Sequence, residues 1–165
     1  DEVDSLEGYR GMGPVRRGNL AWIQKQHDVY GSVVLASTQL FFDQRLVDPG
    51  DAHTFARLEP LGERAFALYD VPDAGLWEFR GRAEVHTYTA AMCWAACDRL
   101  AKIAMRLALD ERAAHWRDRA DAIRSNTLER AWREEAGHFS ASFQSDYLDA
   151  SLLLLADIGF VAEDD

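Results

Sequence analysis

The feature that most constrains the fold of this chain is a series of helix-forming stretches separated by turn residues. Apolar side chains at three- and four-residue steps, such as Val29, Val33 and Leu40, mark one face of a helix. Such patterns and their turn signals predict five helices, at about 28–46, 52–69, 86–109, 111–132 and 149–158. The first, third and fifth begin about 60 residues apart, so the sequence predicts an all-α array of helical hairpins with almost no strand.

Long segments precede the odd-numbered helices, at residues 1–27, 70–85 and 134–148. If each hairpin runs up and back, these segments lie at one end of the helices, where functional residues usually gather. Within the helix at 86–109, the run Ala90–Ala96 is apolar almost all round, so we expect an inner helix that is buried on most sides. The helix at 111–132 has one apolar face, so we expect it to lie outside. Pro60 is expected to kink or split the second helix, and His138–Phe143 alternates enough for a short β-strand.

Composition argues against several classes of function. The formal net charge is −10, and an acidic surface repels nucleic acid and anionic membranes. No apolar run approaches the roughly 20 residues of a membrane span. The five histidines are scattered, so no metal or other cofactor is expected. Cys93 and Cys97 lie four residues apart in an apolar stretch; we expect both to be buried and reduced, which favours a cytoplasmic location.

The loop at 72–81 carries the pattern that most suggests chemistry. Glycines allow tight backbone around Trp77 and Glu78, and Arg80 is close enough in sequence to steer or pair with the carboxyl group. A carboxyl group beside an indole loses part of its hydration, which suits it to proton donation, and an aromatic face stacks on the C–H surface of a sugar. The simpler interpretation is a surface glutamate in a loop whose tryptophan packs into the core.

The N-terminal segment 8–19 is rich in glycine, which invites comparison with a nucleotide-binding phosphate loop. The Gly-Lys-Ser/Thr sequence and the strand–helix alternation of such a loop are both missing. We predict instead a polar binding loop to which Tyr9, Arg16 and Asn19 contribute. The polar run Gln24–Asp28 that follows is interpreted as exposed surface and a helix N-cap.

Several motifs occur in an order that resembles one known family. They are Gly8-Tyr9-Arg10-Gly11, Gly13-Pro14-Val15-Arg16, Gly18-Asn19, Asp28-Val29-Tyr30-Gly31, Pro72-Asp73-Ala74-Gly75-Leu76-Trp77-Glu78-Phe79-Arg80, His86-Thr87-Tyr88, Met92-Cys93-Trp94 and Leu148-Asp149-Ala150-Ser151-Leu152-Leu153. Together, over about residues 6–161, they resemble the prokaryotic glucoamylase-like and trehalase-like members of glycoside hydrolase family 15. The resemblance implies an (α/α)6 barrel, in which six inner helices are ringed by six outer ones, with the active site at one end.

The resemblance also implies a reaction, the inverting hydrolysis of α-linked glucosides, with a carbohydrate as the partner. It assigns Glu78 as the general acid and Trp77 to the wall of the sugar site. The further candidate substrate contacts are Arg80, Tyr9, Arg16 and Asn19. Phe79 departs from the fungal members, which carry a second acidic residue directly after the acid, so the extra contact is not expected here.

The family's N-terminal Trp-x-x-Arg-Asp stretch and its segment with the catalytic base have no counterpart in the sequence. Residues 1–165 therefore resemble the central part of one catalytic domain, with its N-terminal and C-terminal parts absent and about five helices present. Inversion requires two carboxylates roughly 6.5–9.5 Å apart, and no residue here resembles the base, so the isolated piece is expected to be inactive. Uncovered apolar surface, above all on the helix at 86–109, is expected to pack against other chains or the missing part of the domain.

Three interpretations remain open on the sequence alone. The first is a glucoamylase-like release of glucose from α-glucans, or, within the same family, the hydrolysis of α,α-trehalose. The second is a non-catalytic scaffold of helical hairpins that binds a protein partner; it predicts an exposed apolar groove and long loops that do not gather. The third is a sugar-binding relative that keeps Trp77 but has lost the acid function of Glu78.

Overall fold

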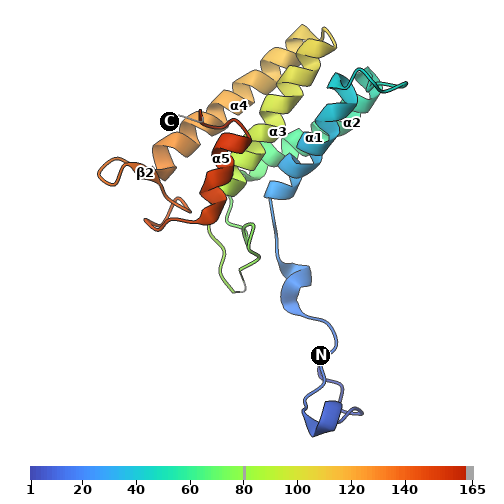
Figure 1. Cartoon of the computed structure of the whole chain (residues 1–165), viewed down its shortest axis with the longest axis vertical. Helices are drawn as coiled ribbons and strands as arrows, with labels where there is room; N and C mark the ends of the chain where they lie inside the picture. The colour runs from blue at the N-terminus through green and yellow to red at the C-terminus, as the bar shows by residue number, and fades with distance from the viewer. Residues whose placement is uncertain (80, 163–165) are drawn as a thin grey trace.

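The computed structural model describes residues 1–79 and 81–162, and its main body is a set of helices packed side by side (Figure 1). Its α-helices are α1 (Asp28–Phe42), α2 (Ala52–Leu68), α3 (Thr87–Arg106), α4 (Asp110–Ala131) and the short α5 (Leu154–Asp157). Its 3-10 helices are η1 (Tyr9–Gly11), η2 (Leu20–Ile23) and η3 (Ala150–Leu153). The all-α fold class is confirmed, and the arrangement of hairpins is that of a fragment of a helical barrel.

The strand content of the described residues is one antiparallel pair. β1 (Trp132–Arg133) pairs with β2 (His138–Phe139), and Trp132 lies opposite Phe139. The short strand predicted at 138–143 is therefore present, but only its first two residues join the ladder.

The helix ends follow local hydrogen bonds that periodicity alone does not reveal. The carboxylate of Asp51 accepts a hydrogen bond from the backbone N–H of Thr54 at 2.8 Å, which caps the N-terminus of α2. The end of α1 was expected near residue 46, but the helix stops at Phe42. The chain turns there because Asp43 accepts hydrogen bonds from the backbone and the guanidinium of Arg45.

Pro60 was expected to kink or split α2, and the helix is not split at this residue. The helix runs without interruption from Ala52 to Leu68. Proline removes one hydrogen bond and frees the carbonyl group four residues earlier, that of Ala56. Both Pro60 and Ala56 are exposed, so water can satisfy the freed carbonyl, while Phe55 and Ala65 hold the opposite side of the helix in the core.

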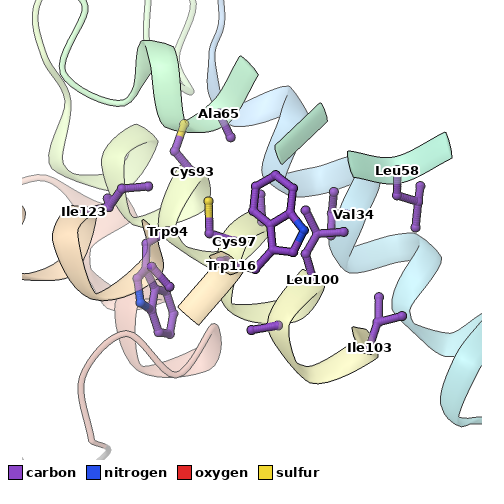
Figure 2. Close-up of a cluster of buried hydrophobic side chains, with 14 of the residues drawn as sticks. Val34, Leu58, Ala65, Cys93, Trp94, Cys97, Leu100, Ile103, Trp116 and Ile123 are labelled. Atoms are coloured by element: carbon purple, nitrogen blue, oxygen red, sulfur yellow. The ribbon is translucent and has the colours of Figure 1, made fainter. Parts of the chain in front are cut away.

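Helix α3 lies at the centre of the bundle, in contact with α1, α2, α4 and α5. Of its 20 residues, 16 are buried, including a series of alanines through which neighbouring helices approach closely. The core around it is drawn in Figure 2, where Trp116 of α4 and Leu100 of α3 lie between Val34 and Ile123. The expectation that α3 needs neighbours from outside this chain is thus wrong, because the chain's own helices cover it on nearly every side.

Glycines allow the closest approaches between these helices. A Cβ atom on Gly31 of α1 would lie 2.1 Å from the carbonyl oxygen of Met92, so α1 crosses the backbone of α3 at this point. A Cβ atom on Gly62 of α2 would lie 2.3 Å from the Leu100 side chain and 2.7 Å from Trp116. Any larger residue at either position forces helices apart.

Exposed apolar side chains gather on α1 and near the C-terminal end of the described chain. Val29, Val33 and Leu40 of α1 are 47%, 42% and 43% exposed, and they form the face that periodicity marked as apolar. The buried face of α1 is the other one, which contains Gly31, Val34 and Phe41. A groove of about 620 Å³ is lined mainly by apolar side chains, of which the most exposed are Leu148 and Leu153. The expected exposed apolar surface is present, but on α1 and beside α5 rather than on α3.

The two cysteines are free and fully buried in α3, as expected. Burial raises the pKa of the Cys97 thiol to about 12, and it raises the pKa of Cys93 as well. Both thiols are therefore uncharged small side chains of the core (Figure 2). None of the helices in residues 1–79 and 81–162 combines the length and hydropathy that crossing a membrane requires.

Candidate active site

Parts of the three long segments meet at one end of the helices, as the hairpin pattern predicts (Figure 1). The segment before α1 is joined to the loop before α3 by the backbone hydrogen bond from Ala74 to the Lys25 carbonyl, at 2.8 Å. The loop before α3 is joined to the segment after β2 by the bond from Phe143 to the Val85 carbonyl, at 2.9 Å. The long loops therefore gather, whereas the scaffold interpretation predicted that they would not.

The buried carboxylate of Asp73 anchors the loop that carries Glu78. Asp73 is 1% exposed and accepts hydrogen bonds from the backbone N–H groups of His27, at 2.9 Å, and Gly75, at 3.1 Å. The hydroxyl group of Thr89 in α3 also donates to it, at 3.3 Å. One side chain therefore joins the start of α1, the loop and the first turn of α3.

After this anchor the chain makes a tight turn that presents Trp77 and Glu78. Gly75 has a φ of 67°, and the N–H of Glu78 donates to the Gly75 carbonyl at 3.1 Å. Glu78 itself has a φ of 52°, in the left-handed region that non-glycine residues seldom adopt. Both Trp77 and Glu78 are exposed, so two consecutive residues of the turn place an indole and a carboxyl group at the surface.

The indole of Trp77 is held by a carboxylate far along the chain. Its Nε1–H donates to both carboxylate oxygens of Asp149, each at 3.0 Å. Asp149 also accepts a hydrogen bond from the backbone N–H of Ser151 at 2.8 Å, which caps η3. Burial raises the pKa of Asp149, but the bonds from Ser151 and Trp77 outweigh that effect, so its pKa lies below the ordinary value.

A small hollow lies behind Trp77, with a volume of about 10 Å³, which is roughly the space that one water molecule needs. Its lining includes Phe79 and His86, whose rings are stacked with centroids 5.9 Å apart. This hollow is too small for a sugar ring. Any sugar that contacts Trp77 must therefore lie against the exposed side of its indole. The residue as a whole is 53% exposed.

A second set of polar contacts closes the loop after Gly81. The guanidinium of Arg82 donates to Glu84 at 2.7 Å and to the hydroxyl group of Tyr147. Mainly because of the bond from Arg82, the pKa of Glu84 falls to about 2, so this carboxylate stays charged at neutral pH. Within residues 1–79 and 81–162, no three His, Cys, Asp or Glu side chains gather to hold a metal ion.

Comparison with known proteins explains why these motifs occur together. The sequence profile of glycosyl hydrolases family 15 matches residues 2–165, nearly the whole chain. The chain belongs to this family. A trehalase from Mycobacterium tuberculosis is 38% identical to it over 164 residues, which are 99% of this chain and 24% of that protein. A trehalase from Thermoplasma volcanium is 32% identical over 165 residues, which are 100% of this chain and 26% of that protein.

This family 15 chain spans about a quarter of the length of the curated relatives it matches, which also include a trehalase from Mycolicibacterium smegmatis at 36% identity. The chain has no match among solved structures. The fragment interpretation made from the sequence agrees with these shares of length, since the matches cover all of this chain but little of each relative.

The structure brings some of the site residues expected of a family 15 enzyme together and leaves others apart. Trp77 and Glu78 are adjacent on the turn, whereas Tyr9 is 72% exposed in the N-terminal segment, which extends away from the helices in Figure 1. Arg16 pairs with Glu2 at 3.2 Å in the same segment.

Two further expectations concern Asn19 and Arg80. The side chain of Asn19 accepts a hydrogen bond from Ala21 at 3.0 Å and so caps η2. Arg80 lies outside the described residues, so its expected pairing with Glu78 stays a prediction. The substrate contacts expected of Tyr9, Arg16 and Asn19 stay predictions as well.

Two residues that sequence analysis did not select contact the acid turn directly. The side-chain amide of Gln24 donates to the Glu78 carbonyl at 2.9 Å, and that of Gln26 donates to the Gly75 carbonyl at 3.2 Å. Asp149, the partner of Trp77, also went unselected. The available signals were the polar run at 24–28, interpreted as surface, and the motif at 148–153, in which Asp149 is the only charged residue.

Proposed function

We propose that this chain is part of an inverting glycoside hydrolase that acts on α-linked glucosides, with Glu78 as the general acid. The observation that carries the proposal is an exposed glutamate directly after an exposed tryptophan, on a turn anchored by Asp73, in a chain of glycosyl hydrolases family 15. The indole of Trp77 offers an apolar face to a sugar ring, and Glu78 next to it can protonate the departing oxygen.

Inversion needs a second carboxylate that activates water on the opposite side of the sugar, roughly 6.5–9.5 Å from the first. Our proposal assigns this base to a part of the catalytic domain beyond this chain, which spans about a quarter of its relatives. The 165-residue chain alone should then be inactive. The exposed apolar face of α1 and the groove beside α5 should pack in the complete domain.

The proposed substrate is α,α-trehalose, because the relatives reported above are trehalases. Glucoamylase-like release of glucose from α-glucans is the second candidate, and it is supported by the resemblance of the motifs to prokaryotic glucoamylase-like proteins. The two reactions share the glucose unit next to Trp77 and differ in the leaving group. Rates on trehalose, maltose and maltotriose, measured with the full-length protein, decide between them.

The role of Glu78 is tested with Glu78→Gln in the full-length protein. Removing a positioned acid should lower kcat on trehalose or maltose by about 10²–10⁴-fold. Fluoride departs without protonation, so the loss on α-glucosyl fluoride should be much smaller. The matched control is Glu134→Gln, since Glu134 is also exposed and beside a tryptophan, with Trp132 Nε1 donating to it at 2.6 Å. Equal losses of kcat on both kinds of substrate would assign Glu78 another role. If the unmodified protein hydrolysed no α-glucoside, a scaffold or a non-hydrolytic relative would be favoured instead.

A further inference from the structure

The backbone of Glu78 needs support, because its φ of 52° is unfavourable for a residue with a side chain. A non-glycine residue held there carries a conformational cost, which the surrounding contacts must offset. The position of a side chain depends on the backbone that carries it. A contact that holds this peptide therefore also fixes the position from which the side chain of Glu78 extends.

Two contacts hold this peptide: its N–H, on Phe79, donates to the Ala74 carbonyl at 3.0 Å, and its carbonyl accepts from the side chain of Gln24. The Gln24 amide donates to the Glu78 carbonyl at 2.9 Å and approaches the Phe79 carbonyl at 3.4 Å. Gln24 is 54 positions away in the sequence, and it follows η2 as the C-cap residue. An amide N–H donates at any pH, so this support does not depend on a titratable group.

Neighbouring residues hold other parts of the same turn. Gln26 donates to the Gly75 carbonyl at 3.2 Å, and the Lys25 carbonyl accepts from Ala74 at 2.8 Å. These bonds hold the first half of the turn, and neither involves the Glu78 carbonyl, although the Gly75 carbonyl also accepts from the Glu78 N–H at 3.1 Å. The segment thus separates two functions that can be measured independently: Gln26 holds the loop, and Gln24 holds the residue that carries the acid.

We propose that Gln24 is a positioning residue, which holds the Glu78 peptide in its left-handed conformation and so directs the carboxyl group towards the glycosidic oxygen. The inference rests on the proposed function, because it needs Glu78 to be a general acid. It predicts that loss of the Gln24 amide weakens only the steps that need protonation by Glu78.

The test uses Gln24→Met in the full-length protein, which keeps the length of the side chain but removes its donor, with Gln26→Met as the matched control. We expect kcat on trehalose or maltose to fall roughly 5- to 10-fold, which corresponds to about 1–1.4 kcal/mol, the net contribution of one hydrogen bond. KM, and kcat on α-glucosyl fluoride, should change little. Gln26→Met should change the rates on both kinds of substrate by the same small factor.

Two further variants separate positioning from folding. In a Glu78→Gln background, Gln24→Met should cause no additional loss, because the group it positions is already gone. Gln24→Glu should be more impaired than Gln24→Met at neutral pH, since a carboxylate cannot donate to a carbonyl group. Its rate relative to the unmodified protein should rise as the pH falls towards about 4.3, where the carboxyl group gains a proton.

The outcomes distinguish this inference from the function on which it rests. If the unmodified protein cleaves no α-glucoside, the proposed function fails and this inference fails with it. If the unmodified protein is active but Gln24→Met loses equally on trehalose and on the fluoride, only the inference is overturned. An additional loss in the Glu78→Gln background would overturn it in the same way.

Discussion

Substitution of Asp98 measures how much one buried charge contributes to the free energy of unfolding. The residue lies in α3 with its side chain only 4% exposed, surrounded by three cations. Lys102 donates to it at 2.8 Å, Arg117 of α4 at 2.9 Å, and Arg99 closes the group. The change Asp98→Asn keeps the shape of the side chain but removes its charge, which leaves three cations near one another.

The size of the effect follows from the exposure of those cations. Removing one partner of a fully buried ion pair costs about 3–5 kcal/mol, because the remaining charge is stranded without water. Here Arg99, Arg117 and Lys102 are 17%, 37% and 51% exposed, so each can recover part of its hydration. We therefore expect Asp98→Asn to lower the free energy of unfolding by about 2–3 kcal/mol.

Urea unfolding followed by far-ultraviolet circular dichroism measures this loss, as a shift of about 1 M in the midpoint for a slope of about 2–3 kcal/mol per M. The control is Asp121→Asn, since Asp121 also faces Arg117 but at 4.0 Å and with 63% of its side chain exposed. It should cost under about 0.5 kcal/mol. If the two variants lose equally little, the charge at Asp98 is screened by water and the reasoning is wrong.

The pH dependence gives an independent check on Asp98. Burial raises the pKa of its carboxyl group, but hydrogen bonds from Lys102 and Arg117 outweigh burial, so the pKa lies below its usual value of 3.8. A lowered pKa in the folded state contributes stability that is fully present above the unfolded pKa and is lost as the pH falls through the folded one. The difference between the unmodified chain and Asp98→Asn should therefore be constant near neutral pH and shrink below about pH 4.

Two further predictions concern the core. Gly62→Ala should destabilise the chain by about 1–3 kcal/mol in the same urea assay, because the new methyl group would overlap Leu100 and Trp116; an unchanged midpoint would mean that α2 shifts freely on α3. Cys93 and Cys97 should resist a thiol reagent in the folded chain and react once urea unfolds it, since both are fully buried and burial holds their pKa values high; rapid labelling of the folded chain would show that α3 is accessible.

The course of the helices was largely predictable from the sequence, because it depends on local signals. The spacing of apolar residues and the turn signals placed the starts of the four long helices within one residue of those observed. Periodicity did not tell which apolar face of α1 is buried. It marked the side with Val33 and Leu40, whereas Val34 and Phe41 are buried. Both sides are apolar, and only the tertiary arrangement decides between them.

The site was predictable only where its residues are neighbours in sequence. Trp77 and Glu78 are adjacent, so their pairing was visible at once. Gln24 lies 54 positions from Glu78, and Asp149 lies 72 positions from Trp77. No local sequence pattern predicts contacts over such separations. Whether a glutamine before a helix faces water or a peptide carbonyl is decided by how the helices cross, which sequence spacing does not encode.

That crossing makes Gly31 more than a packing position. The glycine lies at the start of α1, directly after the segment that holds the acid turn, and its α-carbon rests on the backbone of α3 at Met92. A larger residue there would lift α1 and carry Gln24 away from Glu78 while leaving every polar side chain of the turn in the sequence. A screen for inactive variants should therefore find substitutions at Gly31 as well as substitutions of residues that contact the sugar, although Gly31 itself is buried in the core. In this fold the position of the Glu78 carboxyl group therefore depends on how closely the buried faces of α1 and α3 approach each other.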